Sequence, residues 1–156
     1  MQFAMQAIGM YKESDVASAI KERDHKDSTD LIVRGGHDMK TVVRRLTPLE
    51  CERLQGFPDG WTHIGEWTDS KGKLHKDTDS PKYKALGNSI ALPFWEWMAK
   101  RMAEYLPEGA TMASLFDGIG GFPLVFQRAG IKPIWASEIE EFPIAVTKIH
   151  FPEEET

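Results

Sequence analysis

The feature of this sequence that most constrains its fold is an alternation of strand and helix patterns in the last third of the chain. A short apolar strand pattern precedes a glycine-rich stretch, and then a helix pattern, a second strand pattern and a second helix pattern follow. In chain order these segments are 111–116, 117–121, 122–129, 134–137 and 141–149. This order predicts an α/β unit built on two parallel strands.

An acidic residue ends the second strand pattern, since Glu138 lies twenty positions after Gly118. Glycines at a helix N-terminus let the backbone approach a ligand, and a carboxylate at the next strand end accepts hydrogen bonds from ribose hydroxyls. A dinucleotide fingerprint would need glycine at position 123, where Pro123 stands. A nucleoside ligand without phosphates, such as S-adenosylmethionine, therefore fits better, and a purely structural tight turn is the alternative.

Upstream of this unit, Thr47, Pro48 and Glu50 form a helix-start signal, so a helix is expected from Pro48 to about Gln55, ended by Gly56. Residues 65–82 are polar and are expected to form a loop. A longer helix is expected to start after Asn88 or Ser89 and to bury one apolar face, made of Ile90, Phe94, Trp97, Met98, Met102 and Tyr105. Val42 and Val43 indicate a short strand.

Composition excludes several classes of protein. The 156 residues contain one cysteine and five scattered histidines, which excludes a disulfide framework and makes a metal site unexpected. No apolar run could span a bilayer and no signal peptide is evident, so we expect a cytoplasmic protein without a membrane partner. The net charge of −5 lies entirely in residues 107–156, which hold three basic and eight acidic side chains. The neutral part before them, with its arginines and lysines, is the side expected to face DNA.

Four stretches resemble motifs of the cytosine-5 DNA methyltransferase family. Ser114-Leu115-Phe116-Asp117-Gly118-Ile119-Gly120-Gly121 is similar to the first motif, and Ala136-Ser137-Glu138-Ile139 to the second. Residues 44–59 resemble the ninth motif and residues 83–90 the tenth, while residues 19–24 resemble the tail of a target-recognition region. The resemblance implies an α/β chain with a partial Rossmann-like, S-adenosylmethionine-dependent methyltransferase fold and a small irregular N-terminal remnant of the recognition region.

The resemblance also implies roles for individual residues. Phe116 would lie against the adenine or methionine portion of S-adenosyl-L-methionine, Glu138 would hold the ribose, and Ile139 would pack on the adenine. The cofactor-binding set as a whole would be Phe116, Asp117, Gly118, Ile119, Gly120, Gly121, Glu138, Ile139, Asn88 and Ser89. Arg44 and Arg45 would lie on the side of double-stranded DNA, more as scaffold than as base readers.

The order of the motifs differs from that of the family, because the ninth and tenth precede the first and second. This indicates a circular permutation, and the link from Leu106 to Ala110 spans at most about 17 Å, enough to join neighbouring elements. The expected division is a recognition-region tail in residues 1–40, a ninth- and tenth-motif segment in 41–106, and the S-adenosylmethionine-binding unit in 107–156.

The chain lacks the residues that perform the chemistry in this family. Methylation of cytosine carbon 5 needs a thiolate that attacks carbon 6 of a flipped base, and the family carries it in a Pro-Cys dipeptide. Here Cys51 follows Glu50 and precedes Glu52, inside the expected helix, where the two carboxylates oppose thiolate formation. We therefore expect no catalytic residue in this chain. A second polypeptide would carry the remaining motifs; alternatively the chain is a non-catalytic S-adenosylmethionine- or DNA-binding module, or a truncation of a longer permuted enzyme.

Overall fold

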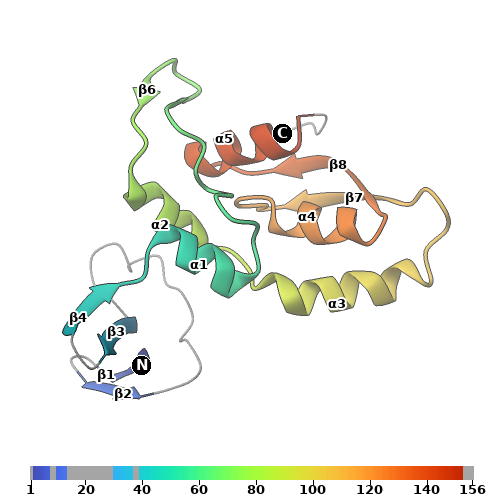
Figure 1. The fold of residues 1–156 in the computed structure, drawn as a ribbon. Coiled ribbons are helices and arrows are strands. Elements are labelled where there is room, and N and C mark those ends of the chain that lie inside the picture. Colours follow the sequence, from blue (N-terminus) through green and yellow to red (C-terminus); the bar gives the residue numbers. More distant parts are fainter. Residues whose placement is uncertain (1, 8–9, 14–29, 37–38, 153–156) are drawn as a thin grey trace.

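The computed structural model describes residues 2–7, 10–13, 30–36 and 39–152, with side chains from Arg44 onward (Figure 1). Four of the described strands pair as an antiparallel sheet in the order β2-β1-β3-β4. Their bounds are Gln2–Ala7 for β1, Met10–Glu13 for β2, Asp30–Gly36 for β3 and Met39–Arg45 for β4. The expectation of an irregular N-terminal part is therefore wrong for these residues, whereas the strand expected at Val42 and Val43 is confirmed as part of β4.

The correction has a simple physical reason. Val33 of β3 lies opposite Val43 of β4, a pair of β-branched residues that favours strand pairing, and Ile32 lies opposite Arg44. Short runs of such residues separated by Gly35-Gly36 suit a hairpin, even though each run alone is a weak signal. The stretch 19–24, which resembles a recognition region, lies outside the described residues.

Helix α1, Pro48–Gln55, has the ends that the sequence predicts. Thr47 and Glu50 form a capping box, in which the Glu50 amide donates to Thr47 Oγ1 and the Thr47 amide donates to Glu50 Oε2. Gly56 closes the helix in the left-handed region at φ 85°, which favours glycine. Both predicted ends of α1 are thus confirmed, and the buried face of the helix, which includes Cys51, packs against the core.

Residues 65–82 differ from the expected loop. They contain a short hairpin of β5, Trp67–Thr68, and β6, Leu74–His75, and they lead into α2, Asp79–Gly87. Asp69 builds the hairpin turn, because its Oδ1 accepts hydrogen bonds from the amides of Lys71 and Lys73. The polar stretch that predicts a loop thus contains an ordered turn, which the Asp69 side chain stabilises.

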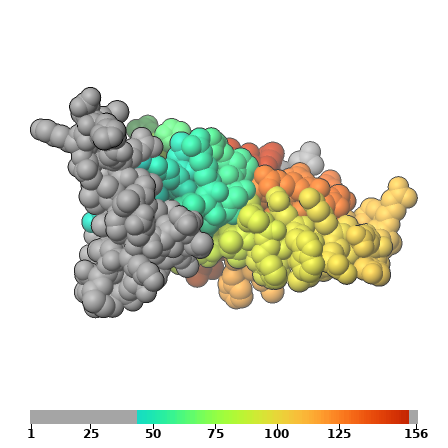
Figure 2. Space-filling model, turned by 60° about the horizontal axis from the view of Figure 1, so that its bottom comes forward, coloured from blue at the N-terminus to red at the C-terminus, as the bar shows by residue number. Residues whose placement is uncertain are grey.

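Helix α3, Leu92–Ala103, begins near Pro93 as predicted, but it buries a different face from the one expected. Leu92 and Ala99 are fully buried, whereas most of the expected core residues are exposed: Phe94, Trp97, Met102 and Tyr105. The helix packs against α4 and lies at the surface of the molecule, as Figure 2 shows. The side of the helix that carries Phe94 and Trp97 is therefore exposed. The small Ala99 side chain allows the close approach of α3 to its neighbour.

The predicted α/β unit is confirmed. Strands β7 and β8 form a parallel pair in which Ser114 is opposite Ala136 and Leu115 opposite Ser137. The unit runs through β7 at Thr111–Leu115, α4 at Gly121–Arg128, β8 at Lys132–Ser137 and α5 at Glu141–His150. One hydrophobic core joins this unit to the preceding helices, and its fully buried members include Leu86, Leu92, Ile119, Val125 and Val146. In the described part of the chain, no helix has the length and apolar character needed to cross a membrane.

Candidate cofactor pocket

A pocket of about 680 Å³ opens beside the carboxyl ends of β7 and β8. Its volume is in the range of small-molecule sites, and strand ends of this kind are where ligands bind in open α/β sheets. It brings together five of the residues expected at a cofactor site, from segments that are distant in the sequence: Asn88, Phe116, Gly118, Glu138 and Ile139.

The glycines of the loop after β7 have two different roles. Gly118 lines the pocket with φ 62°, and apart from its chain neighbours no atom lies within 4 Å of the place that a Cβ would occupy. A Cβ on Gly120 would lie 2.7 Å from the Phe151 ring, and one on Gly121 would lie 2.9 Å from Ile90. Gly118 therefore leaves room for a ligand, while the other two allow the loop to pack against the core.

Glu138 fixes the glycine loop to the end of β8. Its Oε2 accepts a hydrogen bond from the Gly118 amide at 2.7 Å, and its Oε1 accepts from the amides of Ile139 and Glu140 at 2.7 and 2.9 Å. A carboxylate offers about four acceptor positions, so Oε2 keeps capacity for a further donor. The residue thus shapes the pocket and still offers an acceptor to it.

Phe116 and Ile139 are the apolar parts of the pocket from the two strand ends. Their side chains are 85% and 83% exposed, which is unusual for residues of this size. Phe116 also has φ 54°, a left-handed conformation that is costly for a bulky residue. Apolar side chains held exposed beside an acceptor suit a ligand with a flat apolar ring and hydroxyl groups.

Asp117 lies behind the pocket wall. It is buried, its Oδ1 accepts a hydrogen bond from Ser114 Oγ at 2.6 Å, and its Oδ2 has no hydrogen-bond partner within the described part of the chain. Burial raises the pKa of Asp117 to about 6; the bond from Ser114 opposes this rise, and the charge of Glu138 adds to it. The carboxyl is therefore kept from water.

The other expected cofactor residues also lie outside the pocket lining. Ile119 is fully buried, and its carbonyl accepts a hydrogen bond from the Trp61 indole at 2.7 Å. Ser89 follows α2, and its amide donates to the Leu86 carbonyl. Ile119, Gly120 and Gly121 are the buried part of the loop, which packs against the core.

The structure adds pocket residues that the sequence reasoning missed. Trp67 and His75 come from the hairpin, Lys84 from α2, and Phe142 from the start of α5. Lys84 lies in the stretch similar to the tenth motif, so that motif could have pointed to it. Trp67 stands in a polar segment without periodicity, and no sequence signal singles it out.

Arg44 is held within the fold. Its guanidinium makes two bonds to the Glu50 carboxylate, at 2.7 and 2.6 Å, and a third to the Arg45 carbonyl at 2.8 Å. This pairing lowers the pKa of Glu50 to about 2, chiefly through the hydrogen bonds from Arg44. Arg44 therefore braces the start of α1, and Arg45 beside it is exposed.

Two expectations concern reactive and metal-binding groups. Cys51 is 2% exposed within the core, so it is packed as the sequence predicts. Among the described residues, no group of three or more histidine, cysteine, aspartate or glutamate side chains is placed to hold a metal ion.

The residues of the pocket fit S-adenosylmethionine. Phe116 and Ile139 suit its adenine ring, the free capacity of Glu138 Oε2 suits a ribose hydroxyl, and the open side of Gly118 leaves the space that a Cβ would fill. Glu138, Glu140 and Glu141 line the same pocket with Lys84, which pairs with Glu140 at 2.9 Å. The lining keeps a net negative charge, which favours a cationic ligand over a phosphorylated one.

A pocket at the carboxyl ends of two parallel strands, with helices packed beside them, defines the class as an α/β protein. The sequence matches the profile of the family described as C-5 cytosine-specific DNA methylase over residues 2–104 and 110–156, and the chain belongs to that family. The family methylates cytosine in DNA and uses S-adenosyl-L-methionine as the methyl donor.

Individual relatives match shorter parts of the chain. The DNA N-6-adenine-methyltransferase of Escherichia phage P1 is 28% identical over 183 residues, covering 65% of this chain and 24% of the relative. Type II methyltransferase M.ScrFI of Lactococcus lactis subsp. cremoris is 27% identical and covers 61% and 21%. DNA (cytosine-5)-methyltransferase DRM2 of Oryza sativa subsp. japonica is 32% identical and covers 59% and 13%. The matches thus span between about an eighth and a quarter of these relatives.

Proposed function

We propose that this chain is the S-adenosylmethionine-binding part of a DNA (cytosine-5-)-methyltransferase. The observation that carries the proposal is the joint pocket: Asn88, Phe116, Gly118, Glu138 and Ile139 line one hollow although they come from two separate motif groups. Asn88 lines this hollow although the other four residues follow it by about thirty to fifty positions, as the family resemblance implies.

The residues of this pocket have distinct roles in the proposal. Glu138 accepts a hydrogen bond from a ribose hydroxyl through its remaining capacity, and Phe116 and Ile139 contact the adenine or the adjoining methionine portion. When bound, S-adenosylmethionine supplies an electrophilic methyl group on a sulfonium. The net negative charge of the pocket lining favours that positive charge, and Asp117, Ile119, Gly120 and Gly121 are the buried part of the glycine loop. Ser89 lies beside Asn88 at the end of α2.

We further propose that the chain is circularly permuted, with residues 1–40 as a recognition-region tail, 41–106 as the ninth- and tenth-motif segment, and 107–156 as the cofactor unit. The profile match is interrupted at residues 105–109, which is where the link between the two motif groups lies. Helix α3 packs against α4, and α4 packs against β7, so the short link joins two elements of one packed unit. Both observations support a changed chain order within an unchanged spatial arrangement.

A second polypeptide is proposed to supply the nucleophile and the acidic base-binding residue. Cys51 is buried, and the sequence contains no Pro-Cys dipeptide. The β7–β8 pair leaves large apolar side chains open to solvent, with Leu115 65%, Ile134 46% and Trp135 39% exposed. Further strands and a covering layer from the partner would bury these side chains and complete the sheet, and double-stranded DNA would be the substrate of the assembly.

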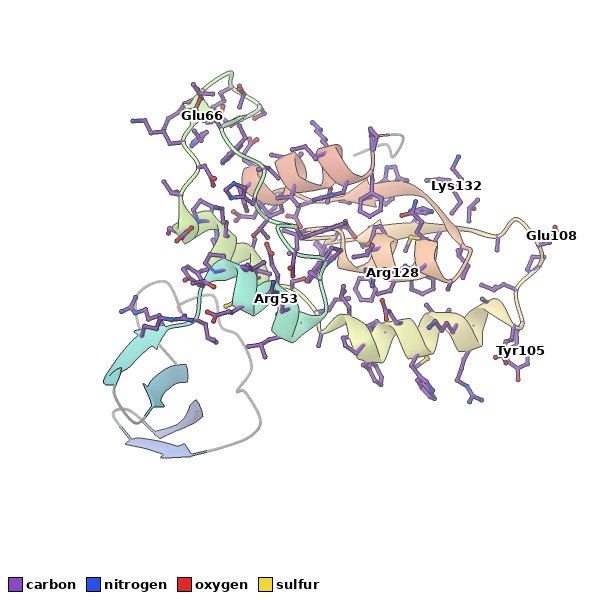
Figure 3. The ribbon with its side chains drawn as sticks, viewed as in Figure 1. Arg53, Glu66, Tyr105, Glu108, Arg128 and Lys132 are labelled. Carbon is purple, nitrogen blue, oxygen red and sulfur yellow. The ribbon has the colours of Figure 1, made fainter. Side chains whose placement is uncertain are left out.

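Calorimetric titration with S-adenosylmethionine tests the pocket. We expect binding by the wild-type chain, weakened binding by Ile139→Ala and Glu138→Gln, and unchanged binding by Glu66→Gln, an exposed residue outside the pocket (Figure 3). Absence of binding, or binding that ignores both pocket substitutions, would contradict the assignment.

A transfer assay tests the assembly. The chain is mixed with a polypeptide carrying the Pro-Cys motif, radiolabelled cofactor and DNA, and the labelled base is identified after hydrolysis. Labelled 5-methylcytosine supports the proposal. Labelled N6-methyladenine, the product that the name of the phage P1 relative indicates for that protein, would contradict it. Cofactor binding without any transfer would instead favour a non-catalytic module.

A further inference from the structure

The β5–β6 hairpin forms one wall of the candidate pocket. Trp67 and His75 both line it, and their rings stack with centroids 4.3 Å apart and planes 10° apart. The Trp67 ring also meets Phe142, another lining residue, edge-on with centroids 5.6 Å apart. These three rings give the pocket an aromatic wall made from residues outside the stretches that resemble the first, second and tenth motifs.

The tip of the hairpin is attached to the start of α5. The Ser70 amide and hydroxyl donate to the two carboxylate oxygens of Glu141, at 3.0 and 2.5 Å. Asp69 stabilises the turn that presents Ser70, since its Oδ2 contacts His75 Nε2 at 2.9 Å while Oδ1 holds the turn amides. Because Glu141 also lines the pocket, the attachment lies at the pocket's edge.

A second hollow of about 470 Å³ lies beside the first, and the two share Glu138, Ile139 and Glu141. Its lining also includes Thr68, Asp69 and Ser70 of the hairpin. The segment around Ile139 is therefore bordered on both sides by the hairpin. Figure 1 shows the hairpin extending beyond α2 on the side of α5.

We propose that this hairpin closes the adenosine end of the cofactor pocket, with Trp67 contacting the adenine ring and the Ser70–Glu141 contact holding the wall in place. The adenosine end is favoured because an aromatic wall suits a flat base, whereas the ammonium and carboxylate of the methionine portion need polar groups. The inference rests on the proposed S-adenosylmethionine pocket and adds a wall to it.

The test is calorimetric titration of the whole chain with S-adenosylmethionine and, separately, with methylthioadenosine, which lacks the amino-acid portion. Trp67→Ala is expected to weaken binding of both by about tenfold, and Trp67→Phe by much less. Ser70→Ala, an exposed change outside the core, is expected to weaken both by about three- to tenfold. Leu74→Ala is the matched control, because Leu74 is 62% exposed in the same hairpin and lines neither hollow.

The outcomes separate this inference from the function on which it rests. If the wild type binds and Ile139→Ala weakens binding, while Trp67→Ala and Ser70→Ala bind as tightly as Leu74→Ala, the hairpin wall is overturned and the pocket stands. If Trp67→Ala weakens S-adenosylmethionine but not methylthioadenosine, the adenosine-end assignment is overturned. If the wild type binds neither compound, the proposed function and the hairpin wall both fall. Should Trp67→Ala not fold, Ser70→Ala decides the question.

Discussion

The indole nitrogen of Trp61 donates a hydrogen bond to the carbonyl oxygen of Ile119 at 2.7 Å, and so joins the turn after α1 to the middle of the glycine loop. Both residues are buried. The same indole stacks on His150 with ring centroids 3.6 Å apart, and the His150 Nε2 contacts the Trp61 carbonyl. The turn that follows the segment similar to the ninth motif therefore fixes the loop of the first motif, a structural role that needs no contact with DNA.

Replacement of Trp61 by phenylalanine keeps an aromatic ring and removes the donor. The buried Ile119 carbonyl would lose this partner, so we expect the free energy of unfolding to fall by about 1–3 kcal/mol. Urea denaturation measures this loss. Trp97→Phe is the control, since Trp97 is 54% exposed on α3 and its replacement should change stability little. Equal effects of the two substitutions would contradict a structural role for the Trp61 bond.

Asp117 should make the stability of the protein depend on pH. Its pKa is about 6 in the folded state against an ordinary 3.8, so the folded state binds the proton more tightly. The contribution of this group is therefore favourable below about pH 4 and is lost as the pH rises toward 6. In the Asp117→Asn variant this decline should be absent.

Unfolding curves between pH 4 and 7.5 compare the wild type with Asp117→Asn. Over that range the wild type should lose stability relative to the variant, by at most about 3 kcal/mol for a pKa difference of this size. Parallel curves for the two proteins would show that the carboxyl is not held in an unfavourable environment. Ser114→Ala should steepen the decline, because Ser114 donates to the ionised form.

Two glycines in one loop should respond differently to the same change. Gly118→Ala places a methyl group in the open space of the pocket, so cofactor affinity should fall while stability falls by only about 1 kcal/mol, the cost of the left-handed backbone. Gly120→Ala adds a collision with Phe151 to the same backbone cost, so its stability loss should exceed about 2 kcal/mol. Thermal unfolding and cofactor titration together measure both effects. A larger stability loss for Gly118→Ala would contradict the two roles.

The open face of the β7–β8 pair can be tested without the cofactor. Leu115→Glu should leave the stability of the isolated chain nearly unchanged, because the side chain is 65% exposed, and should abolish association with a polypeptide that completes the sheet. Analytical ultracentrifugation of the mixture reports the association. Leu54→Glu, on the exposed side of α1, is the matched control and should leave association intact. If Leu115→Glu associates as well as the control does, the partner does not cover this face.

The parts of the fold that the sequence predicted are those in which a local signal and the tertiary structure agree. The capping box at Thr47 and Glu50 and the glycine that ends α1 act within a few residues, and the α/β unit has apolar strands between clear breaks. A glycine after one strand and an acidic residue after the next likewise predicted that Gly118 and Glu138 line one pocket, and they do. Asn88 was placed there by the family resemblance.

The parts that could not be predicted depend on partners far away in the sequence. The apolar stripe of α3 predicted a buried face, yet the side that packs is set by α4 and the small Ala99, so Phe94 and Trp97 remain exposed. Trp67 lies in a polar stretch, and its position is set by its contacts with His75 and with the distant Phe142. The different roles of Gly118 and Gly120 could not be predicted for the same reason. They differ because the ring of Phe151, thirty-one residues further along the chain, packs against Gly120 and not against Gly118.

The single hydrophobic core has a consequence for the continuity of the backbone. Residues on both sides of the link between α3 and β7 pack into that core, while Tyr105 and Glu108 of the link are exposed and project outward (Figure 3). Proteolytic nicking within this link should therefore leave two fragments that stay associated and elute together in gel filtration. The chain can thus have its ends at other points of the same three-dimensional arrangement, because packing rather than the peptide bond holds its two halves together.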